Sequence, residues 1–176
     1  MKADYFVYTG NAYPHKNLSR LIDAILLIKT KLKIVSGRNI FIDRLQIEIK
    51  IKNAQKYVEV LGFVPDEELD KIYKNSIAFV FPTLAEGFGL PPKEAIKAGT
   101  LAVVSDIPVL KEVYEDSVDY FDPMDINSIV ESLQKIMNYT KSQREVKIKY
   151  AKEFVKKYSW SKMAKETLKI YEEVGK

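Results

Sequence analysis

The chain has 176 residues, 47% hydrophobic and 11% aromatic, so it can form one domain with a sizeable core and is not a disordered chain. It contains no cysteine, which excludes disulfides and thiolate metal sites and fits a reducing compartment. The net charge of +4 is modest, and without a patch of interleaved basic and aromatic residues nucleic-acid binding is not expected. We find neither a signal peptide nor an apolar run long enough to span a bilayer, and we expect a cytoplasmic protein.

Apolar runs typical of strands alternate with helical patterns along the chain. We predict strands over residues 5–9, 32–36, 57–61, 77–81, 101–105 and 118–121. Such alternation is typical of a parallel sheet with helices on both faces. The sequence therefore predicts one α/β domain, residues 1–176, with a Rossmann-like doubly wound parallel sheet of about six strands.

Two segments between these strands carry helical patterns of different clarity. Residues 41–51 are ambiguous, because their apolar side chains recur both with period two, as in a strand, and with helical spacing. Their place between two expected strands favours a helix. The segment after the first strand is clearer, since it has an apolar stripe at Leu18, Leu21, Ile22 and Ile25.

The turn after the first expected strand, residues 10–17, offers a cation to a ligand. Asn17 is the expected N-cap of the next helix, which puts Lys16 beside the positive helix end, where a cation costs roughly 0.3 to 1 kcal/mol. A bound diphosphate would reverse that sign, whereas the alternative is an ordinary surface lysine. Gly10 lacks the further glycines of a dinucleotide fingerprint, which argues against a nicotinamide enzyme. His15 is the only histidine, so no transition-metal site is expected.

Residues 82–90 form the expected loop at the carboxyl end of the fourth strand, followed by a helix over residues 91–98. In open α/β sheets ligands bind at this edge. Gly87 and Gly89 remove side-chain bulk, so backbone N–H groups can approach a ligand closely. The helix N-terminus adds unpaired donors and a partial positive charge. Together these features predict an anion site, most simply for a diphosphate.

Two glutamates, Glu86 and Glu94, flank this anion site. Glu94 lies in the first helical turn, where its carboxylate would repel a phosphate but can accept hydrogen bonds from a vicinal diol such as ribose. Glu86 can reach the hydroxyls of a sugar attached beyond the phosphates. Taken singly, each feature has a structural explanation in the helix dipole or in a tight turn. Their combination within nine residues favours a nucleotide-sugar site.

The stretch from Glu86 to Glu94 also matches a family pattern of two glutamates separated by seven residues that begin Gly-Phe-Gly-Leu-Pro-Pro. The chain resembles the nucleotide-sugar-binding C-terminal half of retaining GT-B glycosyltransferases, including bacterial and archaeal mannosyl- and glucosyltransferases. The resemblance covers nearly the whole chain, with further matches at residues 5–10, 14–18, 60–65 and 159–160.

The resemblance implies roles for the site residues. Glu86 would position the donor sugar as the residue nearest the chemistry, and Glu94 would bind the ribose. Lys16, with the amides of residues 88–90, would bind the diphosphate and stabilise the leaving group. The complete predicted donor site is Gly10, Asn11, Lys16, Arg38, Phe63, Val64, Glu86, Gly87, Phe88, Gly89, Leu90 and Glu94. The family seldom needs a bound metal, and we expect no cofactor.

The turn at residues 10–17 departs from the family pattern. Asn11 stands where the family commonly has an arginine that faces the donor diphosphate. Arg38, which follows the second strand, would then supply the missing charge, or else it is a solvated loop residue.

In the family, the turn after the third strand lies against the nucleobase, which implies that Phe63 and Val64 contact the base. The alternative is that both side chains cap the core. The base is not readable from the sequence, but the Pro-His-Lys-Asn turn at residues 14–17 resembles those of mannosyltransferases. GDP-mannose is therefore our first choice of donor, with a UDP-sugar left open.

The resemblance also implies a missing part, because the acceptor site of GT-B enzymes lies on an N-terminal domain that this chain lacks. We expect a fragment of a retaining hexosyltransferase, inactive without that domain, whose acceptor is a glycan or a lipid-linked sugar. The alternatives are a non-catalytic nucleotide-sugar-binding or regulatory module and, third, a sugar-nucleotide epimerase, against which the scarcity of histidine weighs.

The C-terminal part of the chain is basic. Residues 135–176 hold 12 Lys or Arg and 5 Glu, a net charge of +7, against −3 for residues 1–134. This surface would suit peripheral contact with anionic lipid headgroups, although we favour a solvated helix face. The helices over residues 145–174 would pack toward the missing half or pair between two copies as a homodimer. Trp160 is interpreted as a packing anchor for the last helix.

Overall fold

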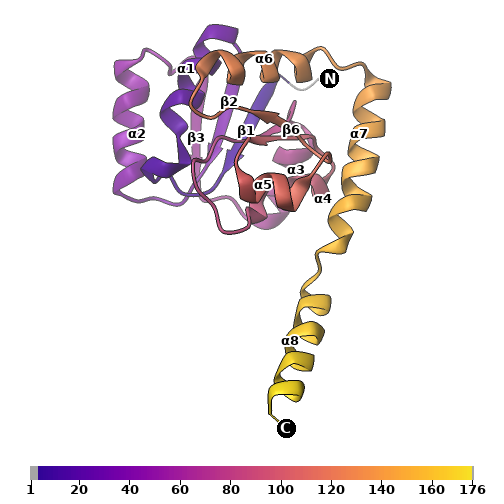
Figure 1. Ribbon diagram of the computed structural model, residues 1–176. Helices are drawn as coiled ribbons and strands as arrows, with labels where there is room; N and C mark the ends of the chain where they lie inside the picture. The colour runs from indigo at the N-terminus through magenta and orange to yellow at the C-terminus, as the bar shows by residue number, and fades with distance from the viewer. Residues whose placement is uncertain (1–3, 176) are drawn as a thin grey trace.

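The protein is described by a computed structural model over residues 4–175, and it contains a six-stranded parallel sheet (Figure 1). The strand order is β3-β2-β1-β4-β5-β6, the order of a doubly wound sheet, so the predicted fold class is confirmed. The strands are β1 (Tyr5–Thr9), β2 (Lys31–Val35), β3 (Val58–Gly62), β4 (Phe79–Phe81), β5 (Ala102–Ser105) and β6 (Asp119–Phe121).

The helices that connect these strands fall into two contacting groups. Helix α1 contacts α2 and α6, whereas α4 contacts α3 and α7, as expected when right-handed crossovers place helices on both faces of the sheet. The bounds are η1 (Pro14–Lys16), α1 (Leu18–Ile28), α2 (Ile40–Ile51), α3 (Asp66–Lys74), α4 (Leu90–Ala98), α5 (Pro108–Tyr114), α6 (Ile126–Met137), α7 (Lys141–Phe154), η2 (Val155–Lys157) and α8 (Trp160–Val174).

The ambiguous segment forms a helix, as predicted from its place between two strands. Asn39 is the N-cap of α2, and its side chain accepts hydrogen bonds from the backbone N–H groups of Phe41 and Ile42 at 3.0 and 3.2 Å. Only one face of the helix is buried, with Ile42, Leu45 and Ile49. The period-two alternation was therefore misleading, because the cap and the buried stripe decide the conformation.

The core lies between the sheet and its two helix layers. Strands β1, β4 and β5 are buried at every position, as is usual for parallel strands covered on both faces. Three tyrosines, Tyr8, Tyr73 and Tyr114, are among the largest fully buried side chains. Each hydroxyl has a hydrogen-bond partner, which a buried phenol requires.

The last helix leaves the rest of the domain, as Figure 1 shows for α8. No residue of α8 is buried, and Trp160 is 65% exposed. The interpretation of Trp160 as a packing anchor is therefore wrong, because the chain turns away at Tyr158 and Ser159 and leaves this helix without a core to pack on. Across residues 4–175, no helix is both long and apolar enough to cross a membrane.

A buried carboxylate fixes α6 and α7 to β6. Asp119 accepts hydrogen bonds from Lys135 at 2.9 Å, Tyr139 at 2.7 Å and Lys147 at 3.3 Å. Burial alone would raise the pKa of Asp119. The hydrogen bonds from Lys135 and Tyr139 and the charge of Lys147 outweigh it, so the pKa lies below its usual value.

Replacing this carboxylate tests its contribution. We expect Asp119→Asn to lower the free energy of unfolding at pH 7 by about 1 to 3 kcal/mol, since hydrogen bonds to a charged group are lost. A lowered pKa in the folded state stabilises the protein above about pH 4, and this contribution is lost as the pH falls through the folded value. Urea unfolding between pH 3 and pH 7 measures both effects, with the exposed Asp70→Asn as control. Equal losses in the two variants would contradict the assignment.

Candidate functional site

The strand order places a topological switch point between β1 and β4. These strands are neighbours in the sheet, although they are separated in sequence by β2 and β3, and the connections leave them in opposite directions. Ligands of open α/β sheets bind at the carboxyl ends of the strands at such a switch point. The loops after β1 and β4, residues 10–17 and 82–89, are those that the sequence singled out, and they meet here.

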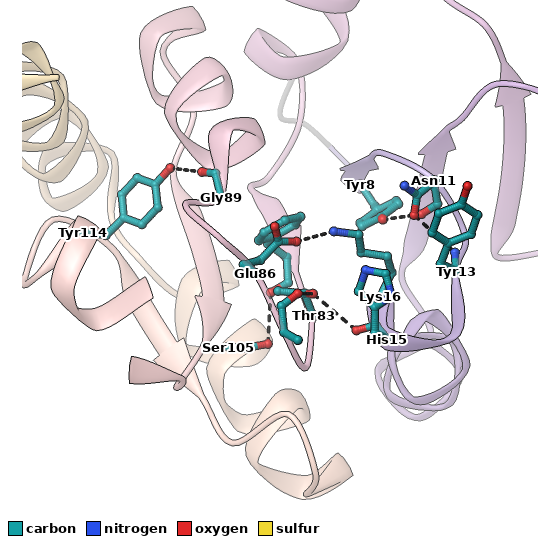
Figure 2. Close-up of polar contacts among 12 residues, drawn as sticks. Tyr8, Asn11, Tyr13, His15, Lys16, Thr83, Glu86, Gly89, Ser105 and Tyr114 are labelled. Atoms are coloured by element: carbon teal, nitrogen blue, oxygen red, sulfur yellow. Dashed lines mark hydrogen bonds and ion pairs between the residues drawn. The ribbon is translucent and has the colours of Figure 1, made fainter. Parts of the chain in front are cut away.

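Backbone contacts fasten the two loops to each other (Figure 2). The carbonyl oxygen of His15 accepts hydrogen bonds from the backbone N–H of Leu84 at 2.7 Å and from the hydroxyl of Thr83 at 3.3 Å. The same hydroxyl lies 2.9 Å from the carbonyl oxygen of Ala85. His15 thus contributes to the site through its backbone.

An ion pair between Lys16 and Glu86 joins the two loops, and Figure 2 shows the two side chains pointing toward each other. The Lys16 ammonium donates to Glu86 Oε1, and the side chains are only 12% and 13% exposed. The ammonium also lies 5.4 Å from the ring centre of Phe81. This pair was not predicted from the sequence, from which the Lys16 charge was expected to be uncompensated, because its members are 70 positions apart.

Asn17 occupies the N-cap position of α1, but its side chain does not cap the helix. Its amide donates instead to the carbonyl oxygen of Pro123 at 2.8 Å, and its side-chain oxygen accepts from Arg20 at 2.8 Å. The predicted position of the N-cap is therefore confirmed, but the side chain of Asn17 does not cap the helix. Asn17 has a φ of 58°, in the left-handed region, whereas side-chain caps usually have extended backbone.

The loop after β4 ends at a glycine that cannot be replaced easily. Gly89 has a φ of +80°, and a Cβ atom there would lie 2.7 Å from Leu110 Cδ2. The hydroxyl of Tyr114 donates to the Gly89 carbonyl oxygen and accepts from the backbone N–H of Lys93 at 3.1 Å. Tyr114, which the sequence argument did not name, thereby ties the end of the loop to the first turn of α4.

The start of α4 leaves a limited set of donors for a ligand. Pro91 and Pro92 have no backbone N–H, and the N–H of Lys93 is bonded to Tyr114. The N–H groups of residues 88–90 have no acceptor within residues 4–175. An anion at this helix end would therefore meet the loop amides predicted from the sequence, and not the amides of a full helical turn.

The turn after β1 is shaped by Gly10 and Tyr8. Gly10 has a φ of +138°, and a Cβ atom there would lie 2.9 Å from the Tyr8 hydroxyl. That hydroxyl donates to the Asn11 carbonyl oxygen at 2.6 Å, and the Asn11 side chain accepts from the Tyr13 N–H at 3.3 Å. Asn11 thus stabilises its own turn.

The other predicted site residues lie along the same edge of the sheet. Arg38 follows β2, is exposed, and forms no ion pair with Glu86 or any other carboxylate in residues 4–175. Phe63 follows β3 and is 83% exposed, so the alternative that it caps the core is wrong, while Val64 is partly buried against the core. The structure therefore joins Lys16 to Glu86 and leaves Arg38 and Phe63 on neighbouring strand ends.

Glu94 is exposed on α4 and lies near the end of β1. The hydroxyl of Tyr73 is 2.7 Å from Thr9 Oγ1. Burial raises the pKa of Tyr73, and the nearby charge of Glu94 raises it further. The two glutamates of the motif thus lie in different settings, because Glu86 is paired and mostly buried whereas Glu94 is open to solvent.

Lys93 is a buried cation that was not predicted from the sequence. Its residue is 7% exposed, and no carboxylate within residues 4–175 pairs with it. Burial lowers the pKa of Lys93. The spacing in the sequence could have indicated that Lys93 is buried. Lys93 precedes the buried Ile96 by three residues, and residues at that spacing share a helix face.

These features define an α/β domain whose candidate site lies at the carboxyl edge of its sheet, where the loops after β1 and β4 meet. The chain belongs to the Glycosyl transferases group 1 family, whose model matches residues 1–154.

Two bacterial relatives and one solved structure illustrate the likeness. The chain is 31% identical over 174 residues to the O-antigen chain mannosyltransferase B of Escherichia coli, which covers 95% of this chain and 45% of the relative. It is 33% identical over 140 residues to the O-antigen chain mannosyltransferase RfbU of Salmonella typhimurium, covering 77% and 39%. The sucrose-phosphate synthase from Thermosynechococcus elongatus has a TM-score of 0.87 at 23% identity, covering 98% and 45%. This likeness confirms the predicted half of a GT-B fold, and the chain spans less than half of each of these proteins.

Two glycine variants separate the roles of the loop. We expect Gly89→Ala to lower the free energy of unfolding by about 1 to 3 kcal/mol, because the new methyl group meets Leu110 and the backbone is left-handed. Gly87→Ala should change stability by less than about 0.5 kcal/mol, since a Cβ atom there meets nothing within 4 Å. Urea unfolding measures both, and a similar loss in both variants would contradict this description of the loop.

A double-mutant cycle tests the central ion pair. Lys16→Met leaves the Glu86 carboxylate mostly buried without its partner, and we expect a loss of about 1 to 3 kcal/mol of unfolding free energy. The double variant Lys16→Met with Glu86→Gln should lose less than Lys16→Met alone, because no unpaired charge remains. Strictly additive losses in urea unfolding would show that the two side chains do not interact in solution.

Proposed function

We propose that this chain is the donor-binding domain of a retaining glycosyltransferase that uses a nucleotide diphosphate sugar. The observation that carries the proposal is the Lys16–Glu86 pair at the switch point, beside loop amides that have no acceptor in the described structure. A cation and free amides suit a diphosphate, and a fixed carboxylate suits sugar hydroxyls. Membership in the Glycosyl transferases group 1 family supports the same assignment.

In this proposal the two members of the ion pair contact different parts of the donor. The Lys16 ammonium contacts the diphosphate and, together with the amides of residues 88–90, stabilises the charge that develops on the leaving group. The carboxylate of Glu86, held in place by Lys16, orients the sugar being transferred. Because Lys16 is already in position before the donor binds, little reorganisation is needed when the glycosidic bond breaks.

The remaining residues bind the nucleoside. Glu94, exposed near the end of β1, accepts hydrogen bonds from the ribose hydroxyls. Phe63 and Val64 contact the base at the end of β3, and Arg38 adds a positive charge in place of the arginine that Asn11 replaces. The exposure of Phe63 and Arg38 supports these roles, because neither side chain is used by the core.

The named relatives support a mannosyl donor. Two of them are called O-antigen chain mannosyltransferases, at 31% and 33% identity, so GDP-mannose is the first donor to test, with a UDP-sugar as the second. We further propose that the acceptor is a glycan or a lipid-linked sugar bound by an N-terminal domain outside this chain, and that the enzyme acts in the cytoplasm with peripheral membrane contact. Without that domain the chain binds the donor but does not transfer the sugar.

Calorimetric titration of the chain with GDP-mannose, UDP-glucose, GDP and UDP tests the proposal. We expect selective binding of one nucleotide, and an affinity loss of roughly tenfold or more for Glu94→Ala and for Lys16→Ala, because each removes a charge-assisted contact. Gly87→Ala should weaken binding while leaving stability unchanged. The exposed Glu145→Ala, on α7, is the matched control. The donor-site assignment is refuted if no nucleotide binds, or if Glu94→Ala behaves like the control.

A further inference from the structure

A hollow lies at the edge of the sheet opposite to the Lys16–Glu86 site. It has a volume of about 1130 Å³ and is bounded by the amino ends of β1 to β4 and by the connection between α6 and α7. None of the predicted donor-site residues lines it. It is therefore separate from the proposed donor site.

The hollow is strongly basic. Asp4 is the one carboxylate in its lining as described, and it pairs with one of the six lining cations, at 2.7 Å. Subtracting that single negative charge from six positive charges leaves an excess of five. The six cations are Lys29, Lys31, Lys56, Lys74, Lys141 and Arg144.

Four of these cations, Lys29, Lys56, Lys74 and Arg144, have no carboxylate partner within residues 4–175. By contrast, two cations outside the hollow, on α6 and η2, have carboxylate partners. Lys135 contacts Asp119, and Lys157 contacts Glu115 at 2.6 Å.

Arg144 is the fixed element of the hollow. Its guanidinium is partly buried and donates to the backbone carbonyl oxygens of Ile136, at 3.5 Å, and Ile77. Both acceptors are neutral, so the positive charge is held in place but not neutralised. Burial lowers the pKa of Arg144, consistent with a cation that lacks a nearby anion. A guanidinium has five N–H donors, and those left over match the oxygens of a phosphate.

The charge of Lys141 lies at the end of α7 where the helix dipole disfavours a cation. Lys141 is the first residue of α7, next to the N-cap Thr140, where a cation is unfavourable unless an anion is near. Glu145 is its only carboxylate neighbour in the described structure, at 3.9 Å, and both side chains are well exposed, so this contact contributes little. An anion in the hollow would offset both the exposed charge and the dipole.

We propose that this hollow binds a phosphate group, carried either by an anionic lipid headgroup or by a free phosphorylated molecule. The concave shape admits a single headgroup or small molecule, and the cations surround it from several elements. Because the hollow and the proposed donor site lie at opposite edges of the sheet, a ligand in the hollow leaves the donor site open.

Site-resolved NMR of the 176-residue chain, titrated with inorganic phosphate at low salt, tests the site. We expect shifts of the amide signals of Thr30, Ser76 and Thr140 in the hollow, separate from any shifts of the donor loop. The double variant Lys56→Glu with Lys74→Glu should bind phosphate there roughly tenfold or more weakly. The control, Lys149→Glu with Lys165→Glu, has the same net charge and exposed positions outside the hollow, and it should behave like the parent chain.

Vesicle sedimentation distinguishes the two sources of phosphate. If the ligand is a lipid headgroup, the parent and the control bind phosphatidylcholine vesicles that contain phosphatidylglycerol, and the hollow variant does not. Phosphate-induced shifts without vesicle binding assign a free phosphorylated molecule. The proposal is overturned if the hollow variant and the control respond equally to both probes. Nucleotide calorimetry on the hollow variant keeps this result separate from the donor site, since donor binding should be unchanged.

Discussion

The ion pair between Lys16 and Glu86 is the contact on which the arrangement of the site depends. It joins two loops that are 70 positions apart in sequence and adjacent only because β1 and β4 are neighbours in the sheet. Two largely desolvated charges are costly unless the scaffold holds them in good geometry. The carbonyl oxygen of His15 provides that support, because its hydrogen bonds tie the backbone of one loop to the other.

The buried tyrosines connect this site to the core. Tyr8, Tyr73 and Tyr114 bury their rings among the strands and helices and place their hydroxyls at the carboxyl edge. The hydroxyl of Tyr8 holds the turn after β1, and that of Tyr73 contacts the last residue of β1. The hydroxyl of Tyr114 holds the end of the loop after β4. The packing of the core therefore determines the loop positions, and a change in a ring would be felt in the site.

The sequence predicted what depends on local patterns and missed what depends on tertiary contacts. Alternating apolar runs and the spacing of Glu86 and Glu94 are local, and they correctly indicated the fold and the loops at its edge. The pairing of Lys16 and the bonds of Tyr114 depend on which strands become neighbours, and strand order cannot be read from spacing. The interpretation of Trp160 as a packing anchor was wrong for a related reason. The sequence alone does not show whether the fold provides a surface that covers an apolar side chain.

Because all strands run in the same direction, the two edges of the sheet have different electrostatic environments. Helices of a parallel α/β fold start at the carboxyl edge and end at the amino edge, so helix dipoles favour anions at the first and cations at the second. This accounts for Lys29 and Lys74, which lie at the ends of α1 and α3. It does not account for Lys141, at the start of α7, or for Arg144, whose charge is partly buried beside neutral carbonyls. The excess charge of the hollow thus exceeds what the fold itself requires, and an external anion is the simplest counterpart for it.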